Sequence, residues 1–249
     1  MDNSDLQARL KEWLMTQGYP LEMRTAQIFH RRGWFFHHSR YYKDPIMGKE
    51  REIDLIAFYD DPARTNRIHG HFVIECKWTP KKPWVLFTAA RHSLNSIGHF
   101  SSTPMTRTAA QAVKDLDPKD ILEFPLFSGV EEGYSIVQAF SNSVAVDAAY
   151  SAVQSAVSAA DYFAHRMSEK TKHRIIYVPT IILDGELFRC SLTNEGGVLV
   201  EQADIGFLIH KTTADEMNRG VHIVRESALL KFIDRAEMTF QSLRRILRK

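Results

Sequence analysis

Two short apolar segments, each with charged residues inside it, constrain the fold of this chain more than any other feature. Residues 51–57 carry Asp54 at their centre, and residues 73–78 carry Glu75 and Lys77. Both segments are typical of buried strands, in which an ionised side chain is costly unless it is paired, hydrogen-bonded or bound to a metal ion. Three charges in two neighbouring strands therefore indicate a functional site rather than packing.

The alternation of side chains along a strand places these charges on defined faces. Glu75 and Lys77 are expected to point to one face and Cys76 to the other. The stretch 59–67 is rich in turn-forming residues, so the two strands are predicted to form an antiparallel pair with a wide loop. This pair would bring Asp54 beside Glu75, where the two carboxylates repel each other unless a divalent cation such as Mg²⁺ neutralises them. The sequence therefore predicts a cation-binding pocket.

A third carboxylate, Glu22, lies in a segment that is predicted to be helical. Pro20 suits the first turn of a helix, and Gly33 follows as a stop signal. Glu22 then falls in the first turn, where an acidic residue is ordinarily explained by the helix dipole alone. For Glu22 by itself, the dipole explanation and a role in the site are both open.

The order of these residues resembles the motif of the PD-(D/E)xK, or restriction-endonuclease-like, nucleases. In that family an acidic residue on the first core helix is followed by an Asp and then by Glu-x-Lys on the next strand. Glu22, Asp54 and the tripeptide 75–77 match this order, with 21 positions separating the Asp from the Glu. Ile53 replaces the proline that gives the family its name, and the resemblance covers residues 19–78.

The resemblance implies an α/β fold with a restriction-endonuclease-like core, that is, a central mixed β-sheet flanked by helices. A chain of 249 residues is long enough for one such domain, so residues 1–249 are predicted to be a single nuclease-like domain. Residues 79–133 contain five prolines and are predicted to be a less regular insertion after the signature strand. Such an insertion often sets substrate specificity.

The resemblance also implies hydrolysis of phosphodiester bonds with Mg²⁺ as cofactor, for which Mn²⁺ can substitute. DNA is the expected substrate rather than RNA, in bacterial defence, restriction or DNA processing. The expected metal ligands are Asp54, Glu75 and the main-chain carbonyl of Cys76, with Glu22 acting directly or through water. Lys77 is expected to orient the attacking water and to stabilise charge on the phosphate. Burial would lower its pKa, whereas the neighbouring carboxylates would raise it, and the sequence leaves the outcome open.

The charged segments are also compatible with two arrangements that lack catalysis. Glu75 and Lys77 could form a solvated ladder on an exposed strand face, with Asp54 capping a turn. The chain could also be a non-catalytic or partner-activated nucleic-acid-binding module that keeps the nuclease fold. If the chain is a nuclease, one such site cuts one strand at a time, so cleavage of both strands would require a homodimer or a partner subunit.

The net charge of +2 says little about nucleic-acid binding, because attraction to phosphate depends on local positive charge. Residues 24–51 hold seven Lys or Arg and only two acidic residues, so this stretch could line a phosphate track. Residues 78–84 are predicted to form a loop that meets nucleic acid, with an ordinary solvated loop as the alternative. Gln111 and Gln154 are two candidates for a polar residue that the family often carries on the helix after the signature strand. The candidate contacts are Arg24, Arg51, Trp78, Lys81, Lys82 and Gln154.

The composition argues against several other classes of protein. Cys76 and Cys190 lie far apart and outside any paired Cys or Cys/His array, so a cytoplasmic protein without disulfide bonds is expected. No apolar segment has the length of a membrane span, and no membrane partner is expected. The His37-His38 and His69-x-His71 pairs lack a second ligand set at zinc-site spacing, so they are interpreted as surface or packing residues.

Periodicity and turn residues predict the remaining elements. Helices are expected over 4–17, near 89–97 and 107–116, over 143–167 and within 226–247. Further strands are expected over 34–42, 174–183, 186–192, 198–200, 205–209 and 221–224. Asp184-Gly185 is typical of a hairpin turn, so strands 174–183 and 186–192 are predicted to be antiparallel partners.

Overall fold

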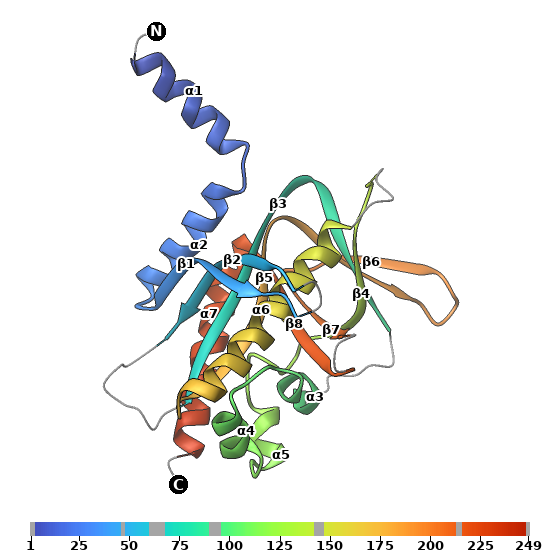
Figure 1. Cartoon of the computed structure of the whole chain (residues 1–249). Coiled ribbons are helices and arrows are strands. Elements are labelled where there is room, and N and C mark those ends of the chain that lie inside the picture. The colour runs from blue at the N-terminus through green and yellow to red at the C-terminus, as the bar shows by residue number, and fades with distance from the viewer. Residues whose placement is uncertain are drawn as a thin grey trace.

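The apolar segments of the chain assemble into an eight-stranded mixed β-sheet that is flanked by helices, which confirms the predicted α/β class (Figure 1). The computed structural model describes residues 3–45, 48–59, 68–89, 96–141, 147–212 and 216–247. The helices are α1 (Asn3–Met15), α2 (Tyr19–Arg31), α3 (Ser96–Ser101), α4 (Arg107–Val113), α5 (Pro118–Leu122), α6 (Ala148–Lys170), the 3₁₀ turn η1 (Glu226–Ala228) and α7 (Leu229–Ile246). The strands are β1 (Phe35–Lys43), β2 (Glu50–Phe58), β3 (Ile68–Thr88), β4 (Glu132–Gln138), β5 (Arg174–Leu192), β6 (Val198–Gln202), β7 (Ile205–Lys211) and β8 (Asn218–Arg225).

The sheet contains both antiparallel and parallel strand pairs. The order is β1-β2-β3-β4-β7-β8-β5-β6, with an additional pairing between β3 and β5. Strands β1, β2 and β3 are antiparallel neighbours, as predicted for the two charged segments. Strand β5 runs parallel to β3 from Ile68↔Arg174 to Phe87↔Cys190, and α6 precedes it in the chain. The β3–β5 pair is thus the longest strand pairing of the described sheet.

Both faces of the sheet are covered, which explains why its central strands are apolar at successive positions. On one face the small side chains of α6, among them Ala156 and Ala160, lie against Val73 of β3 and its neighbours. On the other face Phe29 of α2 and Phe232 of α7 pack around Phe72 of β3, with ring centroids 6.3 Å and 5.5 Å away. Helices α2 and α6 therefore lie on opposite sides of the strand that carries the Glu-x-Lys tripeptide.

The predicted hairpin at Asp184-Gly185 is wrong, because β5 continues straight through these two residues. Asp184 and Gly185 pair instead with Trp78 and Thr79 of β3. A Cβ atom at Gly185 would lie 2.5 Å from the Thr79 hydroxyl and 2.8 Å from its carbonyl oxygen. The glycine is thus needed for close approach of two strands rather than for a turn.

The loop predicted over 78–84 is also replaced by strand, since β3 extends to Thr88 despite Pro80 and Pro83. The β3–β5 register shifts between Thr79 and Trp84, so the prolines lie where regular pairing is interrupted. Lys81 and Lys82 are exposed on this strand. The first ten residues of the predicted insertion are therefore part of the sheet.

Most other predicted elements are present with shifted ends. Helix α6 accounts for the helix predicted over 143–167, of which residues 143–146 lie outside the described part of the chain. The same holds for residues 60–67 of the predicted wide loop and for residues 90–95 of the short helix predicted near 89–97. The helix predicted over 107–116 is α4, and the closing helical region is η1 followed by α7.

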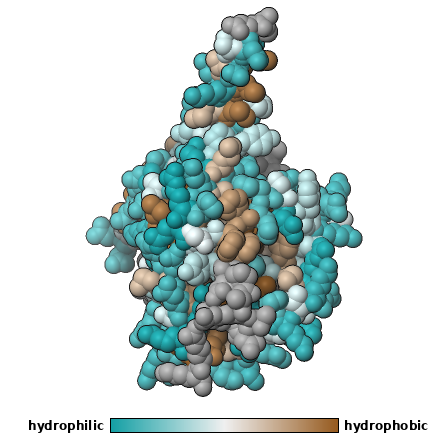
Figure 2. All heavy atoms as spheres, turned by 90° about the vertical axis from the view of Figure 1, so that its left-hand side faces the viewer, coloured by the Kyte–Doolittle hydropathy of each residue, from teal (hydrophilic) through white to brown (hydrophobic). Residues whose placement is uncertain are grey.

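Helix α1 extends away from the sheet, and none of its residues is buried (Figures 1 and 2). Figure 2 shows it rising above the rest of the molecule, with apolar residues at its surface. Leu6, Leu10 and Trp13 are each about half exposed. Within the described residues, no helix combines the length and the apolar character needed to cross a bilayer.

Candidate active site

Asp54 lies where the regular pairing of β2 with β3 ends. The paired register runs from Phe58↔His71 to Leu55↔Ile74, so Asp54 and Glu75 occupy the next positions on the two strands. At this point the main-chain N–H of Cys76 donates a hydrogen bond of 2.7 Å to Oδ2 of Asp54. The Asp54 carboxylate is thereby fixed beside the Glu-x-Lys tripeptide rather than capping a turn.

Glu75 and Lys77 form an ion pair on the α6 side of β3. Nζ of Lys77 donates to Oε1 of Glu75 at 2.6 Å, and Glu75 is only 8% exposed. The Lys77 side chain is 29% exposed, so it is more accessible to solvent than the carboxylate that it binds. Within the described residues, Oε2 of Glu75 is buried without a hydrogen-bond donor. A solvated ladder on an exposed face is therefore not the arrangement that these residues adopt.

The carboxylates of Glu75 and Asp54 keep Lys77 protonated. Burial lowers its pKa, but the charge of Glu75, the hydrogen bond to Glu75 and the charge of Asp54 together raise it above the ordinary lysine value. Lys77 is therefore a cation at neutral pH, and the role of a general base, which requires a neutral amine, is disfavoured.

The three acidic residues carry more negative charge than Lys77 compensates. Burial, together with the charge of Asp54, raises the pKa of Glu22 to about 7. Burial also raises the pKa of Glu75 to about 7, against the lowering effect of Lys77. The pKa of Asp54 is raised by burial as well, although the hydrogen bond from Cys76 opposes this. The fold thus places Asp54 beside the tripeptide and Glu75 against Lys77, and Glu22 lies within electrostatic range of all three residues.

At most two carboxylates among the described residues are placed so that they could bind one divalent cation together. Among the described residues, no group of three His, Cys, Asp or Glu side chains is arranged to hold a metal ion. Mg²⁺, however, keeps several waters and is commonly bound through one or two carboxylates. Oε2 of Glu75, an acceptor without a donor, suits such an ion, and Asp54 lies at the adjacent position. Of the two roles expected for Glu22, the one through water agrees with this geometry.

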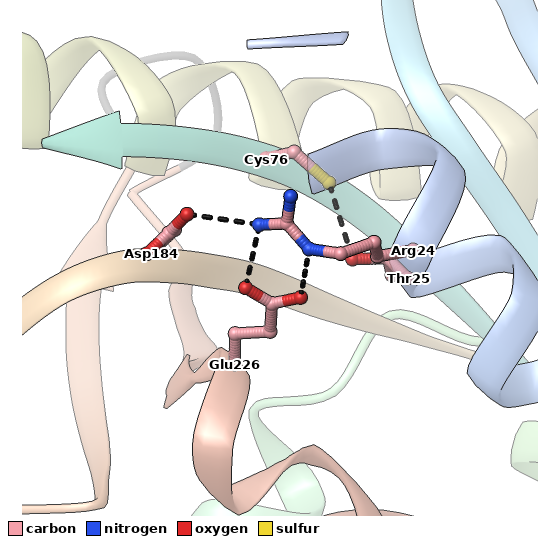
Figure 3. A network of polar contacts seen from close by, with 5 residues as sticks. All are labelled: Arg24, Thr25, Cys76, Asp184 and Glu226. Atoms are coloured by element: carbon pink, nitrogen blue, oxygen red, sulfur yellow. Dashed lines mark hydrogen bonds and ion pairs between the residues drawn. The ribbon is translucent and has the colours of Figure 1, made fainter. Parts of the chain in front are cut away.

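The Cys76 side chain faces away from the ion pair. Its Sγ lies 3.9 Å from Oγ1 of Thr25 on α2, and burial raises the pKa of the thiol well above its ordinary value (Figure 3). Only the main chain of Cys76 is thus available to the site, through the N–H bound to Asp54 and through the carbonyl that was expected to bind metal.

Two of the predicted nucleic-acid contacts are occupied by other partners. Arg24 is bound to Asp184 and Glu226 (Figure 3). Arg51 donates to Oγ of Ser155 on α6 at 3.0 Å and approaches Asp44 at 3.4 Å. Their positive charges are therefore largely compensated within the protein.

The other predicted contacts remain at the surface. Trp78 is 39% exposed, and both lysines at positions 81 and 82 are exposed beside it on β3. Nε2 of Gln154 donates to the Tyr150 hydroxyl one turn earlier on α6. Gln111 lies exposed on α4, away from the helix that covers Val73 and Glu75.

The histidine pairs are packing or surface residues in the described structure, as interpreted from the sequence. His71 lies between the rings of Phe58 and Tyr177, and burial lowers its pKa to about 3. His37 and His38 are exposed on β1. None of these residues belongs to a group that could hold a metal among the described residues.

Sequence patterns missed the long-range partners of Arg51 and Arg24. Ser155 lies in an Ala-rich helix where no pattern marks it, yet it binds Arg51 near Glu75. Asp184 and Glu226 are 160 and 202 positions from Arg24, so no local spacing could connect them. No family model, no curated protein and no solved structure matches the chain.

Proposed function

We propose that this chain is a metal-dependent nuclease of the PD-(D/E)xK type that hydrolyses phosphodiester bonds of DNA. Bacterial defence, restriction or DNA processing is the proposed setting. One observation carries the proposal: Asp54, Glu75 and Lys77 meet at the end of the β2–β3 pairing, with one buried carboxylate oxygen left without a donor. A cluster of acidic groups with raised pKa values around one cationic lysine is typical of catalytic sites.

The architecture supports the finer fold assignment that belongs to this proposal, a restriction-endonuclease-like core. Helix α2 carries Glu22 in its first turn, β2 carries Asp54, and the antiparallel neighbour β3 carries the tripeptide 75–77. This is the order of elements expected from the resemblance. The central mixed sheet with helices on both faces is compatible with it.

The chemistry follows from the charges of the site. A divalent ion between Asp54 and Glu75 would activate a water molecule and polarise the scissile phosphate. Lys77, a cation at neutral pH, would stabilise the negative charge that develops on the phosphate oxygens and would orient the attacking water. Glu22, the more exposed of the two carboxyls with a pKa near 7, would hold a water molecule at the edge of the site.

The test is a cleavage assay on plasmid, linear and single-stranded DNA and on RNA, each with Mg²⁺, Mn²⁺ or EDTA. We expect cleavage of DNA with Mg²⁺ or Mn²⁺, none in EDTA, and losses of at least about 100-fold for Asp54→Ala and Lys77→Ala. Lys114→Ala is the matched control, because Lys114 also neighbours a carboxylate, Asp115, but is exposed and distant in sequence from the site. Cleavage in EDTA, or full activity of both site variants, would contradict the proposal.

A non-catalytic or partner-activated nucleic-acid-binding module is the second candidate. One observation favours it, namely that no third side-chain ligand joins Asp54 and Glu75 among the described residues. Such a module would bind DNA in EDTA as tightly as in Mg²⁺ and would leave it intact. A mobility-shift assay run beside the cleavage assay separates the two candidates.

A further inference from the structure

Arg24 is held by three hydrogen bonds from one guanidinium group (Figure 3). Nε and Nη2 donate to the two carboxylate oxygens of Glu226 at 2.6 Å and 2.8 Å. Nη2 also donates to Oδ2 of Asp184 at 2.9 Å. A bidentate pair of this kind fixes both distance and orientation, and a second acid removes the remaining freedom of the guanidinium.

The two acceptors belong to elements that border the candidate site. Asp184 lies on β5 opposite Trp78, one pair along from Lys77↔Leu183. Glu226 begins η1, directly after β8, which pairs with β5. The guanidinium therefore ties α2 to the part of the sheet that runs beside the Glu-x-Lys tripeptide.

The first turn of α2 is anchored by Leu21, which is buried in the core, and by the guanidinium contacts. Its N-cap, Gly18, makes no side-chain hydrogen bond to the helix, and the preceding helix α1 has no buried residue. Glu22 in this turn is repelled by the charges of Asp54 and Glu75. Without the guanidinium contacts, this repulsion would move Glu22 away from the other carboxylates.

We propose that Arg24 is a positioning residue, which holds the first turn of α2 against β5 and η1 so that Glu22 stays at the Asp54–Glu75–Lys77 cluster. This role replaces the contact with a substrate phosphate that was expected from the sequence. The consequence for cleavage rests on the proposed nuclease function, whereas the consequence for the mobility of α2 does not.

The positioning role and the phosphate-contact role predict opposite effects of Glu226→Gln. If Arg24 positions α2, weakening its carboxylate partner should impair the site just as Arg24→Met does. If Arg24 instead contacts phosphate, releasing it from Glu226 should strengthen DNA binding. Arg24→Met should then reduce the slope of the logarithm of the binding constant against the logarithm of the salt concentration by about one.

The kinetic test compares Arg24→Met, Glu226→Gln, the double variant and Arg24→Lys with the wild type. We expect both single variants to lower kcat by about 10–100-fold with little change in KM or in salt dependence. The double variant should be no worse than either single variant, because both remove the same contact. Arg24→Lys should recover only part of kcat, since an ammonium cannot form the bidentate pair.

Arg32, the C-cap residue of α2, provides the matched control. Its Nη2 donates to Asp234 and Glu237 of α7 at 2.6 Å and 2.7 Å, so Arg32→Met also removes a guanidinium bound to two acids. This contact lies at the C-terminal end of α2, away from Glu22. Arg32→Met should therefore leave kcat within about 2-fold of the wild type, whatever its effect on stability.

Amide hydrogen exchange tests the inference without any cleavage. We expect exchange in residues 19–25 to be about 10-fold faster in Arg24→Met and in Glu226→Gln, but not in Arg32→Met. Unchanged exchange in this turn, or tighter DNA binding by Glu226→Gln, would overturn the positioning role. A wild-type protein that shows no cleavage but has the expected exchange pattern would instead refute the nuclease proposal alone.

Discussion

The main chain of Cys76 and the side chain of Asp54 are joined by a hydrogen bond of 2.7 Å where the pairing of β2 and β3 ends. At this position the N–H of Cys76 binds a side-chain carboxylate rather than a main-chain carbonyl of β2. Asp54 is therefore held by the backbone of the strand that also carries Glu75 and Lys77. The acid of one segment is thus joined directly to the tripeptide of the other.

Replacing Asp54 by Asn should separate the role of its charge from its role in the fold. The Asn carbonyl oxygen can still accept the hydrogen bond from Cys76, so thermal stability should change little. The loss of charge should lower metal-dependent cleavage by at least about 100-fold. Melting curves and cleavage rates measured on the same preparation check both expectations. An Asp54→Asn protein that cleaves at a rate close to the wild type would rule out Asp54 as a ligand.

Removing Lys77 should destabilise the protein in a pH-dependent manner. Lys77→Met leaves Glu75 buried without its cation, at a cost of about 3 kcal/mol in the free energy of unfolding at pH 8. The cost should be smaller at pH 5, because the pKa of Glu75 is already raised to about 7 and the carboxyl is then neutral. Urea unfolding at the two pH values measures the difference.

The double variant Lys77→Met/Glu75→Gln is the control for this prediction. It removes both charges, so it should recover most of the stability lost at pH 8. An equal loss for Lys77→Met at both pH values, with no recovery in the double variant, would show that packing rather than charge explains the effect.

In the absence of metal, the stability of the protein should fall as the pH rises from about 4.5 to about 7. Glu22 and Glu75 have folded-state pKa values near 7, above the ordinary value of 4.5, so the folded state binds more protons than the unfolded state in this range. Their stabilising contribution is complete below the lower value and is lost as the pH passes the higher one. We expect a total loss of about 1–3 kcal/mol after solvent screening is taken into account.

Urea unfolding in EDTA between pH 4.5 and 8 measures this loss. The variant Glu22→Gln/Glu75→Gln should show a shallower dependence, because the remaining ionisable groups are unchanged. Mg²⁺ should also flatten the curve, since a bound cation favours the ionised carboxylates. Identical curves for the wild type and the double variant would mean that these two carboxyls do not titrate differently on folding.

Gly185→Ala should destabilise the protein by about 1–3 kcal/mol, because its Cβ would meet the Thr79 hydroxyl at 2.5 Å and the Thr79 carbonyl oxygen at 2.8 Å. Gly18→Ala is the comparison, since no atom lies within 4 Å of the position that its Cβ would occupy. That change should stay within about 0.5 kcal/mol of the wild type. Equal effects of the two substitutions would contradict the close contact of β5 with β3.

The local pattern of the sequence was sufficient for the antiparallel β2–β3 pair and for the placement of Asp54 beside Glu75 and Lys77. Apolar alternation and turn residues are local signals, and the cost of burying charge points to a site without knowledge of the fold. The same local signals could not decide the protonation of Lys77. That outcome depends on a distance of 2.6 Å to Glu75, which the chain reaches only when folded.

Long-range contacts explain the predictions that were wrong. Asp184-Gly185 has the composition of a hairpin turn, but here the glycine serves the approach of Thr79 from a strand about a hundred positions away in the sequence. The contacts of Arg24 with Asp184 and Glu226 could not be predicted either, because both partners are remote in sequence. Such pairings belong to tertiary structure, which single-sequence periodicity does not encode.

The central claim is that Asp54 and Glu75 together hold a divalent cation. Anomalous diffraction from crystals grown with Mn²⁺ tests it most directly, because Mn²⁺ can stand in for Mg²⁺ and scatters anomalously. We predict a peak within roughly 2–2.4 Å of a carboxylate oxygen of each residue, including Oε2 of Glu75. Crystals in which these two carboxylates carry no peak at saturating Mn²⁺ would contradict the account.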